Sequence, residues 1–232
     1  MGNILVSMSG VSSGYGRVRV LRDVNLELRK GDFMAVVGPN GGGKTTLFRT
    51  ILGLIEPSAG TIEVMGGPPS KGCRKIGYVP QSGTFDRKYP ASAEDVVMMG
   101  LRPRQGILPS GRDLRDSAER AMERTGVTEF RDRRIGDLSG GQLQRAFIAR
   151  ALASEPEMLM LDEPTASLDP EMRAGVCSIL SEVLSEGMTV MMITHDLEGI
   201  EDKADRIIRV NRTVREVSRG EIHAMECGGG LL

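Results

Sequence analysis

The chain has 232 residues, with 30 Lys and Arg against 31 Asp and Glu, so its formal net charge is −1. This balance excludes a polybasic binder of nucleic acids or lipid surfaces as the default interpretation. With no Trp, 5 Phe and 3 Tyr, the chain also lacks the aromatic residues of a base-stacking surface. Hydrophobic residues at 40% and charged residues at 26% indicate one globular domain, or one domain with an insert.

The three cysteines, Cys73, Cys177 and Cys227, are scattered and have no Cys-x-x-Cys spacing. Such sparse cysteines indicate a reducing compartment and no disulfide framework. The sequence shows neither a signal peptide nor an apolar window long enough to span a membrane. We therefore expect a soluble intracellular protein, or a soluble subunit of a larger assembly, in which the 14 Met fill core positions.

The first third of the chain predicts strands of two kinds. Apolar and polar residues alternate over residues 18–28, which favours half-buried antiparallel strands. Residues 33–37 are a continuous apolar run, as in a parallel strand that is buried on both faces. A Gly-rich turn follows, and apolar residues at helical spacing then predict a helix over residues 44–54. Further strands are expected at residues 61–64 and 76–79.

Residues 85–134 differ in composition from the preceding segment, because they contain several prolines and many Arg and Asp residues. Their amphipathic segments predict helices over residues 93–100 and 113–126, within a helical insert. Strands alternating with helices then predict a parallel sheet with helices on its faces, an α/β fold. Its later elements are expected as buried strands at 158–161, 189–193 and 206–210, an edge strand at 212–217 and a helix at 170–187.

The most informative local pattern is the segment Gly38–Thr45, which fits G-x-x-x-x-G-K-[ST] between a predicted strand and a predicted helix. Glycines let successive backbone N–H groups face one concavity, and the helix that follows adds its positive end, so the loop suits phosphate. Lys44 would reach the β- and γ-phosphates, and the Thr45 hydroxyl would bind Mg²⁺. The predicted ATP-binding residues here are Gly38, Pro39, Asn40, Gly41, Gly42, Gly43, Lys44, Thr45 and Thr46.

The alternative interpretation is a Gly-rich turn with a surface lysine. From average residue frequencies, the pattern arises by chance in about one chain in a hundred of this length. The strand and helix around the loop favour nucleotide binding.

Two carboxylates, Asp162 and Glu163, follow the apolar run at 158–161. Asp162 would hold Mg²⁺, and Glu163 would orient or deprotonate the water that attacks the γ-phosphate. A solvated turn is the alternative, since Asp-Glu-Pro is a common kind of strand exit. The phosphate loop in the same chain favours the catalytic interpretation.

A second candidate anion site lies at Leu138–Gln142, where a helix is predicted to begin. Ser139 is a good N-cap, and Gly140 and Gly141 would expose backbone N–H groups at the positive helix end. An ordinary capped helix is the alternative, but this five-residue sequence arises by chance in about one of several thousand chains. The predicted contacts with phosphate at this site are Ser139, Gly140, Gly141 and Gln142.

In this order, the segments Gly38–Thr45, Leu138–Gln142 and Leu159–Glu163 resemble the Walker A, signature and Walker B motifs of ABC-type ATPases. The resemblance covers residues 4–217, which is nearly the whole chain. It implies a RecA-like P-loop core with an N-terminal antiparallel β subdomain and a helical insert. Gly42 and Thr45 stand where the family often has Ala and Ser, and both keep the chemistry that the loop needs.

The resemblance also implies boundaries within a single ABC ATPase domain over residues 1–232. Residues 1–84 and 146–232 would form the nucleotide-binding core. Residues 85–145 would form the helical subdomain that carries the signature.

Further residues match family motifs one by one. Gln81 resembles the Q-loop glutamine, which touches Mg²⁺ and senses a membrane partner. His195 resembles the switch histidine that contacts the γ-phosphate, and Tyr15 resembles the aromatic residue that stacks on adenine; a plain loop histidine and a surface tyrosine are the alternatives. The implied D-loop at the dimer interface is Ser167, Leu168 and Asp169. The implied catalytic residues are Glu163, His195, Gln81 and Lys44, and the implied Mg²⁺ ligands are Thr45, Gln81 and Asp162.

The resemblance implies a head-to-tail homodimer that holds each ATP between the Lys44 loop of one chain and the Ser139–Gly141 amides of the other. A groove lined by residues 81–100 would receive a membrane permease that is a separate chain. The helix over residues 169–186 is expected to act as scaffold rather than as a binding surface.

The segments Gly77–Gln81, Phe85–Arg87 and Glu94–Gly100 resemble ATPases that drive zinc or manganese uptake. This implies an importer subunit on the cytoplasmic face of the membrane, served indirectly by an extracytoplasmic solute-binding protein and without a nucleic-acid partner. Three alternatives stay open: an importer of iron chelate or another substrate, a non-transport ABC ATPase in cofactor assembly, and a regulatory module without turnover.

Overall fold

The structure is a computed structural model that describes residues 3–81, 88–101, 111–166, 168–195, 203–218 and 220–221.

The N-terminal part of the chain is an antiparallel sheet. Strands β1 (Ile4–Tyr15), β2 (Val18–Arg29) and β4 (Ala59–Val64) pair in the order β2-β1-β4. In β2, buried Val24, Leu26 and Leu28 alternate with exposed residues, so one face is apolar. The predicted β subdomain is confirmed.

A six-stranded sheet forms the centre of the molecule, in the order β5-β6-β7-β3-β8-β9. All its pairings are parallel except that of β9 with β8. This arrangement confirms the predicted parallel sheet and the predicted edge strand, which pairs antiparallel with β8. The strands are β3 (Phe33–Val37), β5 (Ile76–Val79), β6 (Met158–Asp162), β7 (Thr189–Ile193), β8 (Arg206–Asn211) and β9 (Thr213–Glu216).

The continuous apolar runs are explained by two hydrophobic cores, one on each face of this sheet. In β3, Phe33 and Ala35 belong to one core, whereas Met34 and Val36 belong to the other. Because successive side chains of a strand point to opposite faces, a strand covered on both sides needs apolar residues throughout. Fully buried methionines in β3, β6 and β7 confirm that methionine fills core positions: Met34, Met158, Met160, Met191 and Met192.

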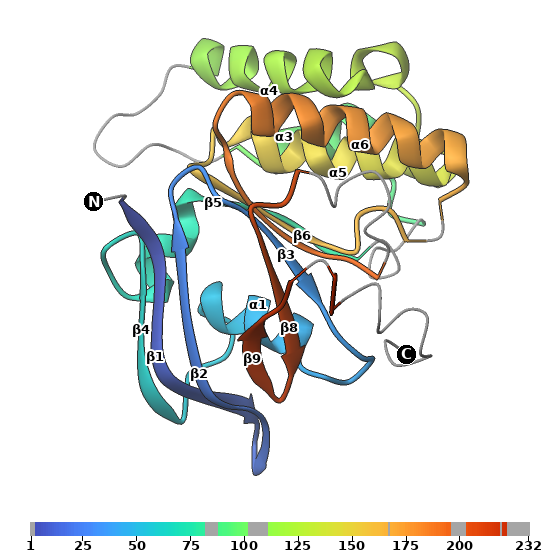
Figure 1. Cartoon of the computed structure of the whole chain (residues 1–232). Coiled ribbons are helices and arrows are strands. Elements are labelled where there is room, and N and C mark those ends of the chain that lie inside the picture. The colour runs from blue at the N-terminus through green and yellow to red at the C-terminus, as the bar shows by residue number, and fades with distance from the viewer. Residues whose placement is uncertain are drawn as a thin grey trace.

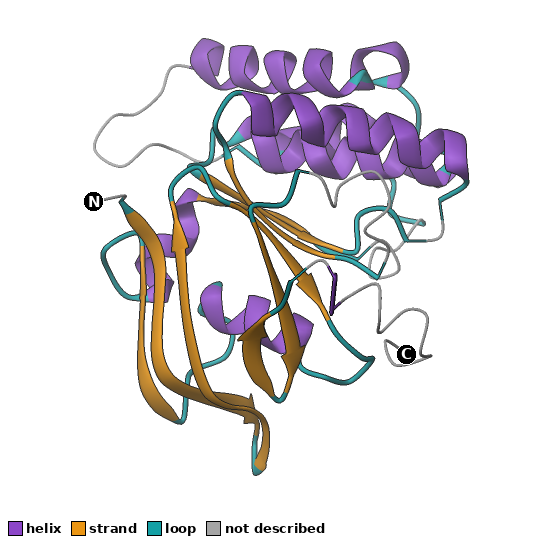
Figure 2. Ribbon diagram, in the orientation of Figure 1, coloured by secondary structure: helices purple, strands orange, loops and turns teal. Residues whose placement is uncertain are grey.

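Helices cover the two faces unequally (Figures 1 and 2). Helix α1 (Lys44–Ile51) lies between the two sheets, and its Phe48 is fully buried there. The opposite face carries α5 (Gly140–Ala153) and α6 (Pro170–Ser185), with α3 (Ala93–Met98) and α4 (Gly111–Thr125) packed against α5. The short helix α2 (Pro69–Gly72) and the 3₁₀ turns Cys73–Lys75, Val127–Phe130 and Ile135–Asp137 complete the described elements.

Most predicted elements are found with slightly different ends. Helix α1 ends at Ile51 rather than at residue 54, and α3 ends at Met98 rather than at residue 100. The boundary expected between residues 145 and 146 lies inside α5, and the division into core and helical subdomain stays a prediction. Among the described helices, none combines the length and the apolar character needed to cross a lipid bilayer.

Candidate active site

The sheet topology places four chain segments at one edge of the central sheet. Strands β3, β5, β6 and β7 run parallel, so the residues that follow them meet at their carboxyl ends. A cavity of about 530 Å³ opens there, a size suited to a nucleotide. It is lined by Val20, Pro39, Asn40, Gly41, Gly42, Gly43, Lys44, Thr45, Thr46, Gln81, Glu163 and His195.

The phosphate loop needs glycine at both of its ends. Gly38 has φ +145°, and a Cβ there would lie 2.2 Å from the carbonyl oxygen of Val210. Gly43 has φ +107°, and a Cβ there would lie 2.7 Å from Leu21 Cδ2. Gly43 is also the N-cap of α1, where no side chain makes a capping hydrogen bond. The backbone donors at the start of α1 are therefore not taken by a capping side chain and suit an anion.

We expect Gly38→Ala to lower the free energy of unfolding by about 3–5 kcal/mol, since it adds backbone strain to a steric overlap with backbone that cannot move aside. The matched control is Gly41→Ala, because Gly41 has φ +74° but no atom of the described residues lies within 4 Å of the position that its Cβ would take. Strain alone should cost the control about 1–2 kcal/mol. Chemical denaturation of both nucleotide-free variants measures the difference, and equal losses would contradict the steric account.

Lys44 is buried within the loop, with only 6% of its surface exposed. Its Nζ donates to the carbonyl oxygens of Gly38, at 2.8 Å, and Pro39, at 3.1 Å. Burial lowers the pKa of Lys44, and the nearby carboxylates of Glu163 and Asp162 oppose this shift. The ammonium group is held by neutral carbonyl groups, so a phosphate oxygen would be a stronger acceptor than either present partner.

Asp162 lies at the end of β6 and is 3% exposed. Burial raises the pKa of Asp162, while a hydrogen bond with Thr45 and the charge of Lys44 act to lower it. The structure therefore brings two of the three predicted Mg²⁺ ligands, Thr45 and Asp162, into contact. The third, Gln81, lines the cavity together with Thr45, whereas buried Asp162 lies behind Thr45 and is not among the lining residues. A hydroxyl, a carboxylate and an amide oxygen are the hard donors that Mg²⁺ prefers.

Glu163 connects the remaining catalytic candidates. Its Oε1 lies 2.6 Å from His195 Nε2, and its Oε2 accepts a hydrogen bond from Gln81 Nε2 at 2.8 Å. The backbone of Glu163 has φ +53°, a conformation that strains a non-glycine residue, and its N–H donates to the Ile193 carbonyl at 3.0 Å. The three side chains form one constellation in which a carboxylate can take a proton from water.

Two predicted nucleotide contacts, Gly38 and Tyr15, are not among the residues that line the cavity. The Tyr15 side chain is 46% exposed, and its hydroxyl accepts a hydrogen bond from Arg49 Nη1 at 2.8 Å. Stacking of Tyr15 on adenine stays a prediction. Val20 lines the cavity instead, and sequence reasoning missed it because it is an ordinary member of an alternating strand.

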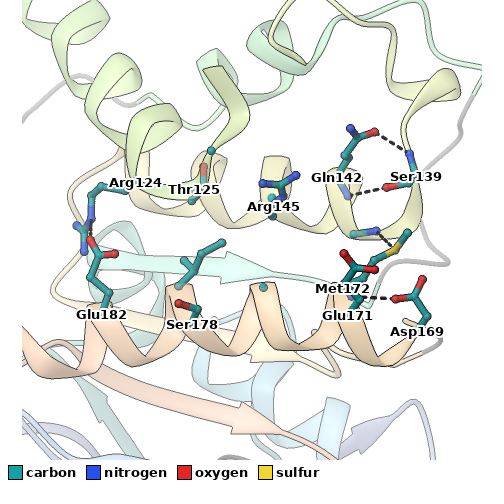
Figure 3. A pocket seen from close by; sticks show the side chains of 14 residues that line it. Arg124, Thr125, Ser139, Gln142, Arg145, Asp169, Glu171, Met172, Ser178 and Glu182 are labelled. Carbon is teal, nitrogen blue, oxygen red and sulfur yellow. Dashed lines mark hydrogen bonds and ion pairs between the residues drawn. The ribbon is translucent and has the colours of Figure 1, made fainter. Parts of the chain in front are cut away.

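Three signature residues, Ser139, Gly141 and Gln142, line a second cavity, of about 580 Å³, between α4, α5 and α6 (Figure 3). Ser139 is the N-cap of α5: its Oγ accepts from the Gln142 N–H at 3.2 Å, and its own N–H donates to Gln142 Oε1 at 3.1 Å. Of the residues that the structure describes, none lines both this cavity and the one at the phosphate loop. The two predicted anion sites are therefore separate within one chain.

The start of α6 forms the opposite wall of the second cavity, in addition to the scaffold role expected for this helix, whose apolar residues are buried in the core. Asp169 is its N-cap and accepts from the Met172 N–H at 2.8 Å. Asp169, Glu171 and Met172 all line the cavity, while Val176, Leu180 and Val183 of α6 are buried in the core. Of the predicted D-loop, Leu168 and Asp169 are described, and Ser167 lies outside the described residues.

Comparisons with known proteins agree with this geometry. Residues 21–166 match the family described as ABC transporter. The chain is 41% identical to the manganese transport system ATP-binding protein MntA of Synechocystis sp., over 90% of this chain and 82% of that protein. It is 35% identical to the zinc transport system ATP-binding protein TroB of Treponema pallidum, over 94% of this chain and 81% of that protein.

The fold also matches a solved structure, the dimeric post-hydrolysis state of the ATP-binding cassette MJ0796 with ADP and Pi. The TM-score is 0.77 at 28% sequence identity, and the alignment covers 92% of this chain and 98% of that one.

Proposed function

This chain is an ATP-hydrolysing member of the ABC transporter family, and we propose that it powers the import of manganese or zinc through a separate membrane permease. The observation that carries the ATPase function is the single cavity that brings together the phosphate loop, Glu163, His195 and Gln81. Similarity to manganese and zinc transport subunits over at least nine-tenths of the chain favours a metal as the cargo.

The hydrolytic roles follow from the contacts in the cavity. Lys44 and the N–H groups at the start of α1 would bind the β- and γ-phosphates. Glu163 would accept the proton of the attacking water, and His195, 2.6 Å from its carboxylate, would hold that carboxylate in place beside the γ-phosphate. Gln81, hydrogen-bonded to Glu163 at 2.8 Å, would link this site to the segment that follows β5.

We assign the Mg²⁺ ion of this reaction to Thr45, Asp162 and Gln81. The contact between Thr45 and buried Asp162 supports this set, and all three residues offer oxygen ligands. When bound, the cation would offset the negative charge of the β- and γ-phosphates. Its positive charge would also favour the ionised form of Asp162 over the neutral form that burial favours.

ATP would act as the contact between two copies of the chain. The phosphate loop and Ser139–Gly141 lie at different cavities, so one chain would supply each half of a shared site to its partner. The dimeric relative with ADP and Pi supports this arrangement. A head-to-tail pair with two-fold symmetry would hold two nucleotides.

The permease would dock beside the segment that follows Gln81, on the cytoplasmic face of the membrane. In the described part of this segment, residues 88–101, Tyr89 is 51% exposed and Met99 is 52% exposed, and apolar side chains at a surface favour protein contacts. Residues 82–87 of the predicted groove lie outside the described residues. A solute-binding protein on the other side of the membrane would deliver the metal to the permease.

We expect manganese- or zinc-loaded binding protein to raise ATP turnover several-fold when the chain is co-purified with its permease from native membranes and reconstituted in vesicles. Phosphate release with the metal-free binding protein is the control. A permease partner without a response to either metal would contradict metal import and redirect the test to chelated iron. Recovery only in the soluble fraction, with an assembly complex, would contradict transport.

A further inference from the structure

The signature helix meets the start of α6 through an unusual hydrogen bond. The N–H of Gly141 donates to the thioether sulfur of Met172 at 3.3 Å (Figure 3). The next N–H, that of Gln142, is taken by Ser139 Oγ at 3.2 Å. Both donors are therefore occupied without a nucleotide, in contrast to the start of α1, where no side chain caps the helix. A thioether is a weak acceptor, so the Gly141 donor is held loosely.

Close packing explains why position 141 is glycine and leaves little room at position 140. A Cβ on Gly141 would lie 2.9 Å from Met172 Cβ and Cγ, and a Cβ on Gly140 would lie 3.3 Å from Leu168 Cδ2. Neither glycine has a left-handed backbone, so conformational freedom is not the reason. Residues 168–172 thus form a surface directly against the signature backbone, and the Met172 side chain is its closest part.

The backbone of Met172 is fixed while its sulfur can move. Its N–H is held by the Asp169 carboxylate at 2.8 Å, and its side chain is only partly buried. The sulfur lies beside the cavity of about 580 Å³ that Gly175 and Ser178 also line. An unbranched side chain with three rotatable bonds can turn into such a space without a shift of the backbone.

We propose that Met172 is a positioning residue of the signature: its sulfur holds the Gly141 N–H in the nucleotide-free chain and releases it to the γ-phosphate of the partner's ATP. The proposal rests on the head-to-tail site proposed above. A phosphate oxygen is an anionic and much stronger acceptor, so it displaces the sulfur. Because Met172 lies one turn beyond Leu168 and Asp169, this exchange also changes the contacts of the D-loop segment.

Two substitutions test the proposal in opposite directions. Met172→Leu keeps an apolar side chain but removes the acceptor, so we expect the ATP concentration for half-maximal dimerisation to fall about two- to fivefold. Met172→Gln places an amide oxygen, a stronger acceptor than sulfur, at a similar distance from the backbone. We therefore expect the ATP concentration for half-maximal dimerisation to rise at least about two- to fivefold. A purely structural role would shift both variants in the same direction.

The measurement is analytical ultracentrifugation of the full chain with increasing ATP, in a Glu163→Gln background that prevents turnover. Met188→Leu is the matched control, because Met188 packs against the same core beyond the other end of α6 and should leave the midpoint unchanged. Thermal unfolding without ATP confirms that each variant is folded. If ATP-dependent dimers form at the same ATP concentration in Met172→Leu and Met172→Gln, the role of Met172 is overturned but the head-to-tail site is not. Absence of dimers in Glu163→Gln itself would overturn the head-to-tail site, and this inference with it.

Discussion

Glu163→Gln should lower the turnover number for ATP by about 10²- to 10⁴-fold, the contribution expected of a general base, while ATP still binds. Glutamine keeps the shape of the side chain, and its amide can still hydrogen-bond to Gln81 and His195, which lie 2.8 Å and 2.6 Å from the carboxylate oxygens. It cannot take a proton from water. Because ATP would then persist, we expect the variant to accumulate as an ATP-bound dimer.

The measurement combines steady-state phosphate release with gel filtration in the presence of ATP and Mg²⁺. Glu157→Gln is the matched control: Glu157 lies just before the first residue of β6, where its exposed side chain pairs with Lys75 at 2.7 Å. The control removes the same charge and should keep turnover within about twofold, because exposed ion pairs contribute little. A Glu163→Gln chain that stays monomeric with ATP would refute the shared nucleotide site, and one that keeps its turnover would refute the role of Glu163 as base.

Lys44→Met should raise the dissociation constant for ATP at least about a hundredfold. Each hydrogen bond to a charged group contributes about 1.5–3 kcal/mol, and each 1.4 kcal/mol corresponds to about a tenfold change in affinity. The loss of two contacts with phosphate therefore accounts for the expected effect. In the nucleotide-free chain, by contrast, the substitution removes a buried charge whose burial is unfavourable, as its lowered pKa indicates.

The unfolding midpoint measured without ATP therefore separates a role of Lys44 in binding ATP from a role in folding. We expect the unfolding midpoint of nucleotide-free Lys44→Met to stay within a few degrees of the unmodified chain, although ATP no longer raises it. Scanning calorimetry with and without ATP measures both quantities. Lys71→Met, at the exposed end of α2, is the matched control and should keep the full shift with ATP. A large loss of stability without ATP would show that Lys44 acts in folding.

Several parts of the site could be predicted from local sequence because their physics is local. The glycines of Gly38–Gly43 and the lysine after them specify an open helix start whatever surrounds them. Ser139 predicted an N-cap, and the structure confirms it as part of a capping box with Gln142. Continuous apolar runs at residues 33–37 and 158–161 predicted strands with two covered faces, and the two cores confirm this interpretation.

The order of the strands in the central sheet could not be predicted from local sequence, although it brings Glu163, His195 and Gln81 together. Strand β7 lies between β3 and β6, so His195 comes beside Glu163, 32 residues away in sequence, and Gln81 meets the same carboxylate from 82 residues away. The family resemblance implied that these residues act together. Their contacts follow from the pairing of distant strands, for which hydrophobic periodicity carries no signal.

By itself, the sequence predicted which segments would bind phosphate, which strands are buried and where the helices begin, because each depends on residues a few positions apart. Only the tertiary structure decided that Tyr15 bonds to Arg49 rather than lining the cavity, and that Val20 lines it instead. It also decided that the Gly141 N–H donates a hydrogen bond to the sulfur of Met172, 31 residues away in sequence. These contacts depend on how whole elements pack, since packing sets which side chains from distant segments come within hydrogen-bonding distance.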